Sequence, residues 1–169
     1  CHPEPVYLPR APCMNDQYLP ESPVPGLIPT LNKTGWMTEG LDAYSQAFAV
    51  YAGSCGGEVL DIGCAYGVAT LAALEHGARV CACDMDARHL DILARRTPAP
   101  LKQRLRCVVG VMPDVDFPAG TFAAILASRV LHFLSGEDIE AAVTKMHGWL
   151  QPGGRGYLIA DTPFTGPWY

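Results

Sequence analysis

Two aspartates at the ends of neighbouring predicted strands are the residues whose types and spacing point most directly to chemistry. Asp61 lies at the end of the apolar run Val59–Ile62, and Asp84 follows it by 23 residues, at the end of the run Arg79–Asp84. A carboxylate at this offset is typical of proteins that bind the two hydroxyls of a ribose. The spacing therefore indicates a ribose-bearing cofactor. Either aspartate could instead only cap the segment that follows it, and Asp86 is also available as a helix cap.

The turn after the first of these strands contains two glycines that would let the backbone approach a ligand. In Gly63-x-Ala65-x-Gly67 each glycine lacks a Cβ and tolerates positive φ. The helix predicted to begin near Val68 would direct its free N–H groups towards an anionic or polar ligand. The pattern lacks the third glycine of the dinucleotide fingerprint, which argues against a nicotinamide-dependent oxidoreductase, as does the lack of a second catalytic module.

Predicted strands and helices alternate along the chain after a first helix within residues 41–52. We expect strands at 59–62, 79–84, 105–110, 122–128 and 155–161, and helices at 68–76, 87–97 and 135–150. This alternation implies right-handed crossovers and a parallel sheet that is covered on both faces. The predicted fold class is therefore α/β with a doubly wound parallel sheet. Ligands of such sheets bind beyond the carboxyl ends of the strands.

The N-terminal residues differ in composition from the rest of the chain. Eight of the 15 prolines fall within residues 1–30, which predicts an extended, non-helical arm. We therefore divide the chain into an arm, residues 1–35, and a cofactor-binding domain, residues 36–169. The arm could fold over the cofactor with Trp36 and Met37 as apolar anchors, or it could be a mobile tail.

Charge and hydropathy exclude several classes of function. The net charge of −5 disfavours a nucleic-acid partner. The longest apolar runs, such as Phe122–Ala127, are too short to span a bilayer, so we expect no membrane segment. A local basic cluster is either a solvated helix end and loop or a patch for an anionic substrate. It consists of Arg95, Arg96, Lys102, Arg104 and Arg106.

The cysteines point to a reducing compartment. There are seven, an odd number, and they are scattered rather than paired, which favours free thiols in a cytoplasmic protein. Cys81-x-Cys83 has no second pair at zinc spacing, so we interpret it as two small residues in a buried strand and expect no metal.

The motifs taken together resemble those of the class I S-adenosylmethionine-dependent methyltransferases. Four segments carry the resemblance in the same order: residues 59–70, 79–86, 121–134 and 149–162. It implies a Rossmann-like sheet of order 3-2-1-4-5, S-adenosyl-L-methionine as cofactor and S-adenosyl-L-homocysteine as product. The family's core continues into an antiparallel hairpin that this chain lacks. We therefore expect either a fragment or a homodimer that pairs through the edge of the fifth strand.

The resemblance also assigns roles to individual residues. Asp61 would hold the methionine amino group directly or through water, and Asp84 would accept both ribose hydroxyls. Gly63 and Cys64, in the same turn as Ala65 and Gly67, would pass beside the methionine moiety and sulfonium. Ala65 replaces the family's middle glycine, a small change that tightens the turn without filling it.

The adenine and the far end of the methionine would meet residues from three further loops. Met85 would lie on the adenine face, and Val111 and Met112 would border the ring. Ser128 would offer its carbonyl or hydroxyl near the methionine amine. The family often has aspartate where Val111 stands, so one hydrogen bond to adenine must come from elsewhere or be absent.

Methyl transfer requires little beyond the placement of a nucleophile and the exclusion of water. His132 is the best-placed candidate for a general base or substrate contact, although a structural role is the alternative. Arg129 could bind a substrate carboxylate. Tyr66 is either a substrate contact or a packing residue. The remaining helical histidines are expected on the surface or at an interface: His76, His89 and His147.

The sequence thus predicts a cytoplasmic S-adenosylmethionine-dependent methyltransferase. It would transfer a methyl group in line to an oxygen, nitrogen or carbon nucleophile of a small-molecule substrate. The alternative is a non-catalytic domain that binds the cofactor or a partner, which the missing hairpin and Val111 favour.

Overall fold

A computed structural model describes residues 16–161 of the chain, so the start of the predicted arm and the last eight residues lie outside the described part. Its centre is a five-stranded, fully parallel sheet. In spatial order the strands are β5 (Leu105–Val109), β4 (Arg79–Asp84), β3 (Glu58–Ile62), β6 (Phe122–Ser128) and β7 (Leu150–Ile159). This is the order 3-2-1-4-5, so the predicted fold class and strand order are confirmed.

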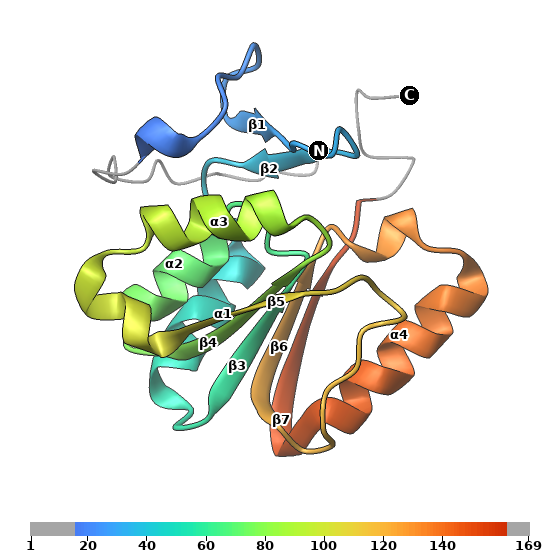
Figure 1. Cartoon of the computed structure of the whole chain (residues 1–169). Helices are drawn as coiled ribbons and strands as arrows, with labels where there is room; N and C mark the ends of the chain where they lie inside the picture. Colours follow the sequence, from blue (N-terminus) through green and yellow to red (C-terminus); the bar gives the residue numbers. More distant parts are fainter. Residues whose placement is uncertain (1–15, 162–169) are drawn as a thin grey trace, which may run out of the picture.

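Helices cover both faces of the sheet (Figure 1). They are α1 (Ala43–Ser54), α2 (Val68–Glu75), α3 (Ala87–Arg96) and α4 (Gly136–Trp149). Short 3₁₀ segments follow α3, at η2 (Ala99–Arg104), and β6, at η3 (Leu131–Phe133). The first three helices share one apolar core with alternate residues of β3, β4 and β6. Helix α4 packs on the opposite face of the same strands. The strand order reverses between β3 and β6, which fixes where a ligand crevice can form.

Three side chains define where the helices begin. Asp42 accepts hydrogen bonds from the backbone N–H groups of Tyr44 and Ser45, both at 2.9 Å, at the start of α1. Asp86 accepts from the N–H of Arg88 at 3.0 Å and caps α3. Ser135 caps α4, where its hydroxyl oxygen accepts from the N–H of Asp138 at 3.2 Å. Because Asp86 is the cap of α3, Asp84 is not needed for that task.

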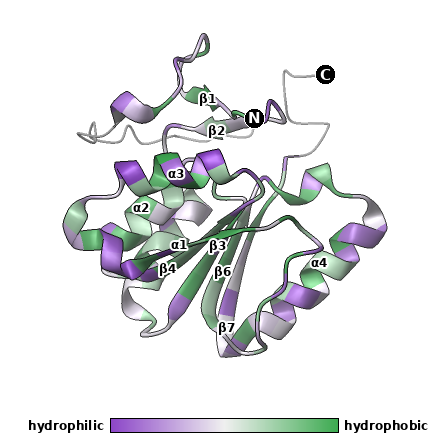
Figure 2. Cartoon of the chain, viewed as in Figure 1, coloured by the Kyte–Doolittle hydropathy of each residue, from purple (hydrophilic) through white to green (hydrophobic). Residues whose placement is uncertain are grey.

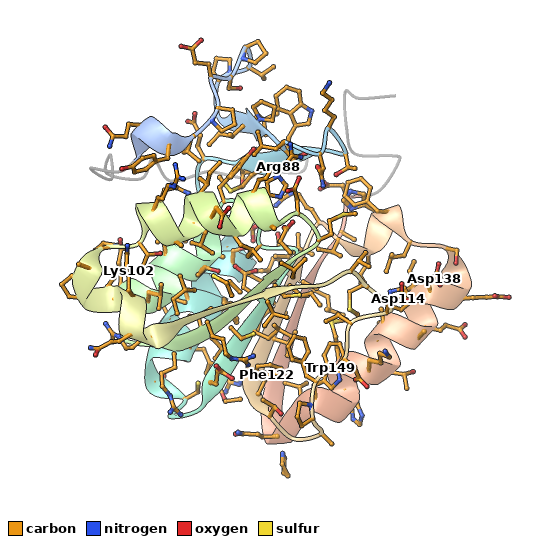
Figure 3. The ribbon with its side chains drawn as sticks, in the orientation of Figure 1. Arg88, Lys102, Asp114, Phe122, Asp138 and Trp149 are labelled. Carbon is orange, nitrogen blue, oxygen red and sulfur yellow. The ribbon has the colours of Figure 1, made fainter. Side chains whose placement is uncertain are left out.

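The apolar strands and the polar outer surfaces of the helices divide as a doubly wound fold requires. Figure 2 shows β3 and β6 as largely hydrophobic, whereas α3 and α4 carry hydrophilic residues on their outer sides. On the α4 face, the rings of Phe122 and Trp149 both make edge contacts with Phe117, at centroid distances of 5.2 and 5.0 Å. Figure 3 shows Phe122 and Trp149 close together between the sheet and α4.

Strand β7 differs from the prediction at its start. The sequence Gln151-Pro-Gly-Gly154 is expected to end the preceding helix, with the strand starting at Arg155. The structure instead starts the strand at Leu150, which pairs with Phe122, and resumes regular pairing at Arg155 opposite Ala124. The prediction was wrong because the glycines and proline form an irregularity within the strand and not a turn before it.

The described part of the N-terminal arm contains a small antiparallel sheet of its own. Strands β1 (Leu27–Pro29) and β2 (Trp36–Thr38) pair in a hairpin that crosses the expected boundary at residue 35. Figure 1 shows it above the carboxyl ends of the central strands. The expectation of an arm without helix is wrong for Asp16–Tyr18, which form one 3₁₀ turn between prolines. A single turn is short enough to fit between them.

Within residues 16–161, no helix is long and apolar enough to cross a membrane. In the same range β7 pairs only with β6. The pairing of this edge with a second copy stays a prediction.

The close packing of α1 on α2 gives a test of the fold. A Cβ added at Gly53 would overlap the backbone carbonyl of His76, which cannot swing aside. Alanine is normally favoured over glycine in helices by about 1 kcal/mol. We nevertheless expect Gly53→Ala to lower the free energy of unfolding by about 1–3 kcal/mol, as measured by denaturant titration.

The matched control is Gly148→Ala, at the equivalent penultimate position of α4. Nothing lies within 4 Å of a Cβ there. This variant should be as stable as the wild type or more so, by up to about 1 kcal/mol. Equal stabilisation by both substitutions would contradict the described packing of α1 on α2.

Candidate functional site

A cavity of about 680 Å³ lies between the carboxyl ends of the central strands and the β1–β2 hairpin. Pockets for small ligands and cofactors typically measure about 300–1,000 Å³. Ten of the residues singled out from the sequence line it: Asp61, Gly63, Cys64, Ala65, Asp84, Met85, Val111, Met112, Ser128 and Arg129. His132 lines it as well, and Gly67 and Tyr66 do not.

The turn after β3 depends on left-handed backbone at three positions. Gly63 has φ +69° and Gly67 has φ +78°, and a Cβ at Gly63 would overlap the side chain of Val130. Ala65 also has positive φ, at +46°. An L-residue in this conformation costs roughly 1–2 kcal/mol, which is the physical reason why glycine suits this position. The turn therefore keeps the glycine conformation although a methyl group is present.

Asp61 is the polar group at the floor of the cavity. Its side chain is buried, and its Oδ2 accepts a hydrogen bond of 2.7 Å from the hydroxyl of Thr70 on α2. Burial raises the pKa of Asp61 from 3.8 to about 7, and the neighbouring Asp84 adds to the increase. A cation close to this carboxyl group would favour its ionised form and so lower its pKa again.

Asp84 is held more firmly than Asp61. Its Oδ2 accepts from the backbone N–H of Ala65 at 2.8 Å, and its Oδ1 accepts from the N–H of Asp86 at 2.9 Å. Nδ1 of His89 lies 2.9 Å from the same Oδ1. Because Asp61 pairs with Ala82 in the strand register, Asp61 and Asp84 lie on the same face of the sheet. Both carboxylates border the same cavity.

Apolar side chains form the cavity wall beyond Asp84. Met85 and Val111 are 54% and 42% exposed although apolar, and both line the cavity, as does Met112, which is buried. Exposed apolar side chains that line a pocket indicate a surface that a flat, apolar ligand group would cover.

Arg129 follows β6 and is already paired with carboxylates. Its guanidinium lies 3.4 Å from Oδ2 of Asp42 and 3.3 Å from Oδ2 of Asp161, and within 3.4 Å of the Ser128 hydroxyl. Its backbone is left-handed, with φ +56°. These two partners, at the start of α1 and after β7, reduce the attraction that Arg129 offers to the carboxylate of a substrate.

Aromatic residues surround the outer part of the cavity. His132 is exposed on η3, and its ring lies 4.2 Å from that of Phe133. Phe133 is 58% exposed and Trp36, on the hairpin, is 41% exposed. Trp36, His132 and Phe133 all line the cavity. The rim thus combines one titratable group with two large apolar rings.

The side chains of two candidate residues, Tyr66 and Cys64, are buried. Tyr66 is fully buried, and its hydroxyl donates to the carbonyl of Pro29 at 2.7 Å, which supports the interpretation as a packing residue and not a substrate contact. Burial also raises its pKa to about 12. The thiol of Cys64 is buried, which raises its pKa well above the usual range, so it does not act as a thiolate.

The basic cluster takes no part in the site. None of its five residues lines the cavity. Arg96 is buried and donates to the carbonyl of Tyr66, and Arg106 pairs with Glu58 at 2.8 Å. Figure 3 shows Lys102 on the flank of the molecule, away from the hairpin. Among residues 16–161 no group of three histidines, cysteines or acidic residues is placed to hold a metal ion.

Sequence reasoning missed one residue and one element of the site. His89, expected at the surface or at an interface, is only 1% exposed and touches both Asp84 and the arm. The sequence position of His89 could have indicated this contact. It lies five residues after Asp84, on the first turn of the following helix, where its side chain can point back to the end of the strand. The arm was expected either to fold over the cofactor, with Trp36 and Met37 as anchors, or to be a mobile tail, but the β1–β2 hairpin within it was not predicted.

Comparison with known proteins decides the family. The profile of a methyltransferase domain family matches residues 59–154, from β3 into β7. The chain belongs to this methyltransferase domain family. Its matched segment contains Asp61, Asp84 and the whole glycine-containing turn, but not the hairpin.

A curated relative agrees with this assignment. The chain is 36% identical over 110 residues to the cypemycin N-terminal methyltransferase of a Streptomyces species, a match that spans 64% of this chain and 43% of the relative. The chain thus spans less than half the length of that curated relative.

Solved structures match the fold. A TehB-like S-adenosylmethionine-dependent methyltransferase from Corynebacterium glutamicum superimposes with a TM-score of 0.57 at 27% identity, over 69% of this chain and 62% of that one. The glycopeptide N-methyltransferase MtfA, solved with S-adenosylmethionine, gives a TM-score of 0.60 at 24% identity, over 68% and 51% of the two chains.

The raised pKa of Asp61 predicts an unusual pH dependence of stability in the free protein. Asp61 is protonated below pH 4 in both the folded and the unfolded chain, and only the folded chain keeps the proton up to about pH 7. The contribution of Asp61 to the free energy of unfolding is therefore fully present below pH 4 and is lost as the pH rises through 7. The loss amounts to at most about 4 kcal/mol.

Denaturant titration of wild type and Asp61→Asn at pH 5 and pH 8 measures this contribution. The amide cannot ionise, so the variant should gain stability relative to the wild type as the pH rises. A constant difference between the two proteins at both pH values would show that Asp61 is ionised in the fold throughout.

Proposed function

We propose that this domain is a methyltransferase that uses S-adenosyl-L-methionine to methylate an amine, with S-adenosyl-L-homocysteine as the product. The observation that carries the proposal is the placement of Asp61 and Asp84 on one cavity, at the ends of adjacent strands and on either side of a left-handed turn. In the register of the sheet these residues are about 8 Å apart along the strand ends. This separation suits a nucleoside at one carboxylate and an amino-acid group at the other.

The residues of the turn and its neighbours fit the two ends of this cofactor. Asp84 faces the ribose, and Met85, Val111 and Met112 offer the apolar surface that an adenine ring covers. At the other end Asp61 takes the methionine amino group, whose positive charge favours the ionised carboxylate.

Close approach of the backbone completes the cofactor's binding site. Gly63 and Cys64 line the cavity, and the methionine chain can pass beside their backbone because Gly63 has no side chain and the thiol of Cys64 is buried. Ala65 and Gly67 keep the turn open, and the oxygens of Ser128 lie on the far side of the cavity. The bound cofactor supplies an electrophilic methyl group, and the chain has only to position the acceptor and exclude water.

The charge of the cavity favours an amine over a carboxylate as the acceptor's polar group. Three aspartates line the cavity: Asp61, Asp84 and Asp161. Arg129 also lines it, but its guanidinium is already paired with Asp161 and Asp42. The relative that is 36% identical is named for methyl transfer to the N-terminus of cypemycin, which supports the same chemistry. We therefore propose the N-terminal amine of a peptide as the acceptor, in place of the small molecule expected from the sequence.

A protonated amine must lose a proton before it can attack the methyl group. His132 is exposed at the rim of the cavity and can carry that proton to water. Trp36 and Phe133, beside it, offer apolar area for the first side chains of a peptide.

The proposal is tested by transfer of a labelled methyl group to a small set of peptides with different first residues. A free N-terminus should be methylated, and the same peptides with an acetylated N-terminus should not. Binding of the cofactor without transfer to any amine, alcohol or small-molecule acceptor would instead favour the non-catalytic alternative.

Two variants separate catalysis from cofactor binding in this assay. His132→Ala should lower kcat by about 100-fold near neutral pH with little change in the KM for the cofactor. Asp84→Asn should raise the KM for the cofactor at least tenfold, whereas Asp114→Asn, an exposed control outside the cavity, should leave both constants unchanged. An unchanged kcat for His132→Ala would show that His132 is not the general base.

A further inference from the structure

His89 is a polar residue in a position where a helix normally places an apolar one. It lies on the first turn of α3 and is only 1% exposed. A buried imidazole has two ring nitrogens to satisfy, and each unsatisfied one would be costly. Both are satisfied here, one by the cofactor site and one by the hairpin.

The partners of His89 fix its protonation state. The backbone N–H of Leu31 points at Nε2, 3.0 Å away, so Nε2 must be the acceptor and carry no proton. Nδ1 therefore carries the proton and donates it to Oδ1 of Asp84 at 2.9 Å. The ring is neutral and of one tautomer, with an acceptor on the arm side and a donor on the sheet side.

The bond from His89 completes the restraint of the Asp84 carboxylate. A carboxylate has about four acceptor sites. Oδ1 uses its two for His89 and the N–H of Asp86, and Oδ2 uses one for the N–H of Ala65. About one site remains, on Oδ2. Without the bond from His89, the carboxylate could rotate and offer Oδ1 to a ligand instead.

On the other side, two adjacent hydrogen bonds join the hairpin to the body, next to the apolar cluster that Ile28 and Met37 form with Tyr66. The N–H of Leu31 donates to His89, and the carbonyl of Pro29 accepts from the hydroxyl of Tyr66. The rings of Tyr66 and His89 meet edge to face, with centroids 4.9 Å apart. Leu27, Thr30, Trp36 and Met37 of the same hairpin line the cavity.

We infer that His89 is a positioning residue that links the cofactor's ribose to the hairpin over the cavity. Its Nδ1–H aims Oδ2 of Asp84 at a single ribose hydroxyl, and its Nε2 holds Leu31. A ligand that engages Asp84 thereby strengthens the attachment of the hairpin, and the attached hairpin preorganises Asp84. This inference rests on the proposed binding of S-adenosylmethionine, and it replaces the expected contact of Asp84 with both hydroxyls by a contact with one.

Two substitutions of His89 separate its two bonds. In His89→Gln the amide oxygen stands near the position of Nε2 and can accept from Leu31, while the donor to Asp84 is lost. In His89→Asn the amide N–H₂ stands near the position of Nδ1 and keeps that donor, while the acceptor for Leu31 is lost. His89→Phe removes both bonds and keeps a buried ring.

The experiment uses the full chain with S-adenosylhomocysteine as the probe. Calorimetry measures its Kd, and amide hydrogen exchange measures protection of residues 27–38 with and without it. In the wild type the ligand should slow exchange in the hairpin at least fivefold. His89→Phe should weaken binding about tenfold and abolish that ligand-induced protection. His89→Asn should recover most of the affinity, and His89→Gln should recover protection of the hairpin in the free protein.

Tyr66→Phe is the matched control for the hairpin. It removes the bond to Pro29 without touching Asp84, so exchange in the free hairpin should rise while the ligand-induced protection persists. Equal losses of affinity and of hairpin protection in all three His89 variants would show that His89 contributes only to packing, and would overturn the inference. Wild-type affinity and protection in His89→Phe would overturn it too.

Failure of the proposed function would give a different result. If the wild type does not bind S-adenosylhomocysteine, the proposed function fails and the link to ribose fails with it. If the wild type binds and the variants bind equally well, the inference about His89 alone is overturned.

Discussion

The carboxylate of Asp84 is the point on which the architecture of this site depends. Three donors meet on it: the N–H of Ala65 from the turn after β3, and the N–H of Asp86 and the ring of His89 from the start of α3. Charge-assisted hydrogen bonds of this kind are stronger than neutral ones. A single ionised group at the end of one strand thus fixes a neighbouring turn, the next helix and, through His89, the hairpin.

The rest of the cavity follows from that restraint and from the topology of the sheet. Parallel strands end at one edge, and the reversal of order between β3 and β6 leaves a crevice there. The left-handed turn from Gly63 to Gly67 passes along this crevice without side chains that would fill it. The hairpin then closes the crevice from above and gives it a volume of about 680 Å³. Acidic groups dominate its charged lining, which is why we expect it to attract cations.

The doubly wound parallel sheet and the convergence of Asp61 and Asp84 could be predicted because both follow from local patterns, whereas the strand order was implied by the resemblance to the methyltransferases. Apolar runs with periods of strands and helices define the units, and right-handed crossovers leave few ways to assemble them. The contacts that the sequence could not predict join residues far apart along the chain. Leu31 meets His89 across 58 residues, and Asp42 meets Arg129 across 87. Such pairs decide whether a histidine is buried and whether an arginine is available to a substrate.

The interpretation of single side chains failed where one residue type suits two environments. Tyr66 can lie at a rim or in a core, and only the path of the hairpin decides that it is buried under Pro29. The β1–β2 hairpin itself has strands of three residues, too short for a periodic pattern to reveal. By contrast, Asp42, Asp86 and Ser135 act as helix caps through contacts within three residues, which is why caps are predictable from sequence.

The most direct test of this account is a crystal structure of the full chain with S-adenosylhomocysteine bound. We predict that one ribose hydroxyl donates to Oδ2 of Asp84 and that the amino group of the homocysteine lies beside Asp61. The adenine should rest against Met85 and Val111 beneath the hairpin. A ligand bound elsewhere, or one whose ribose avoids Asp84, would contradict the claim that these two carboxylates define the cofactor site.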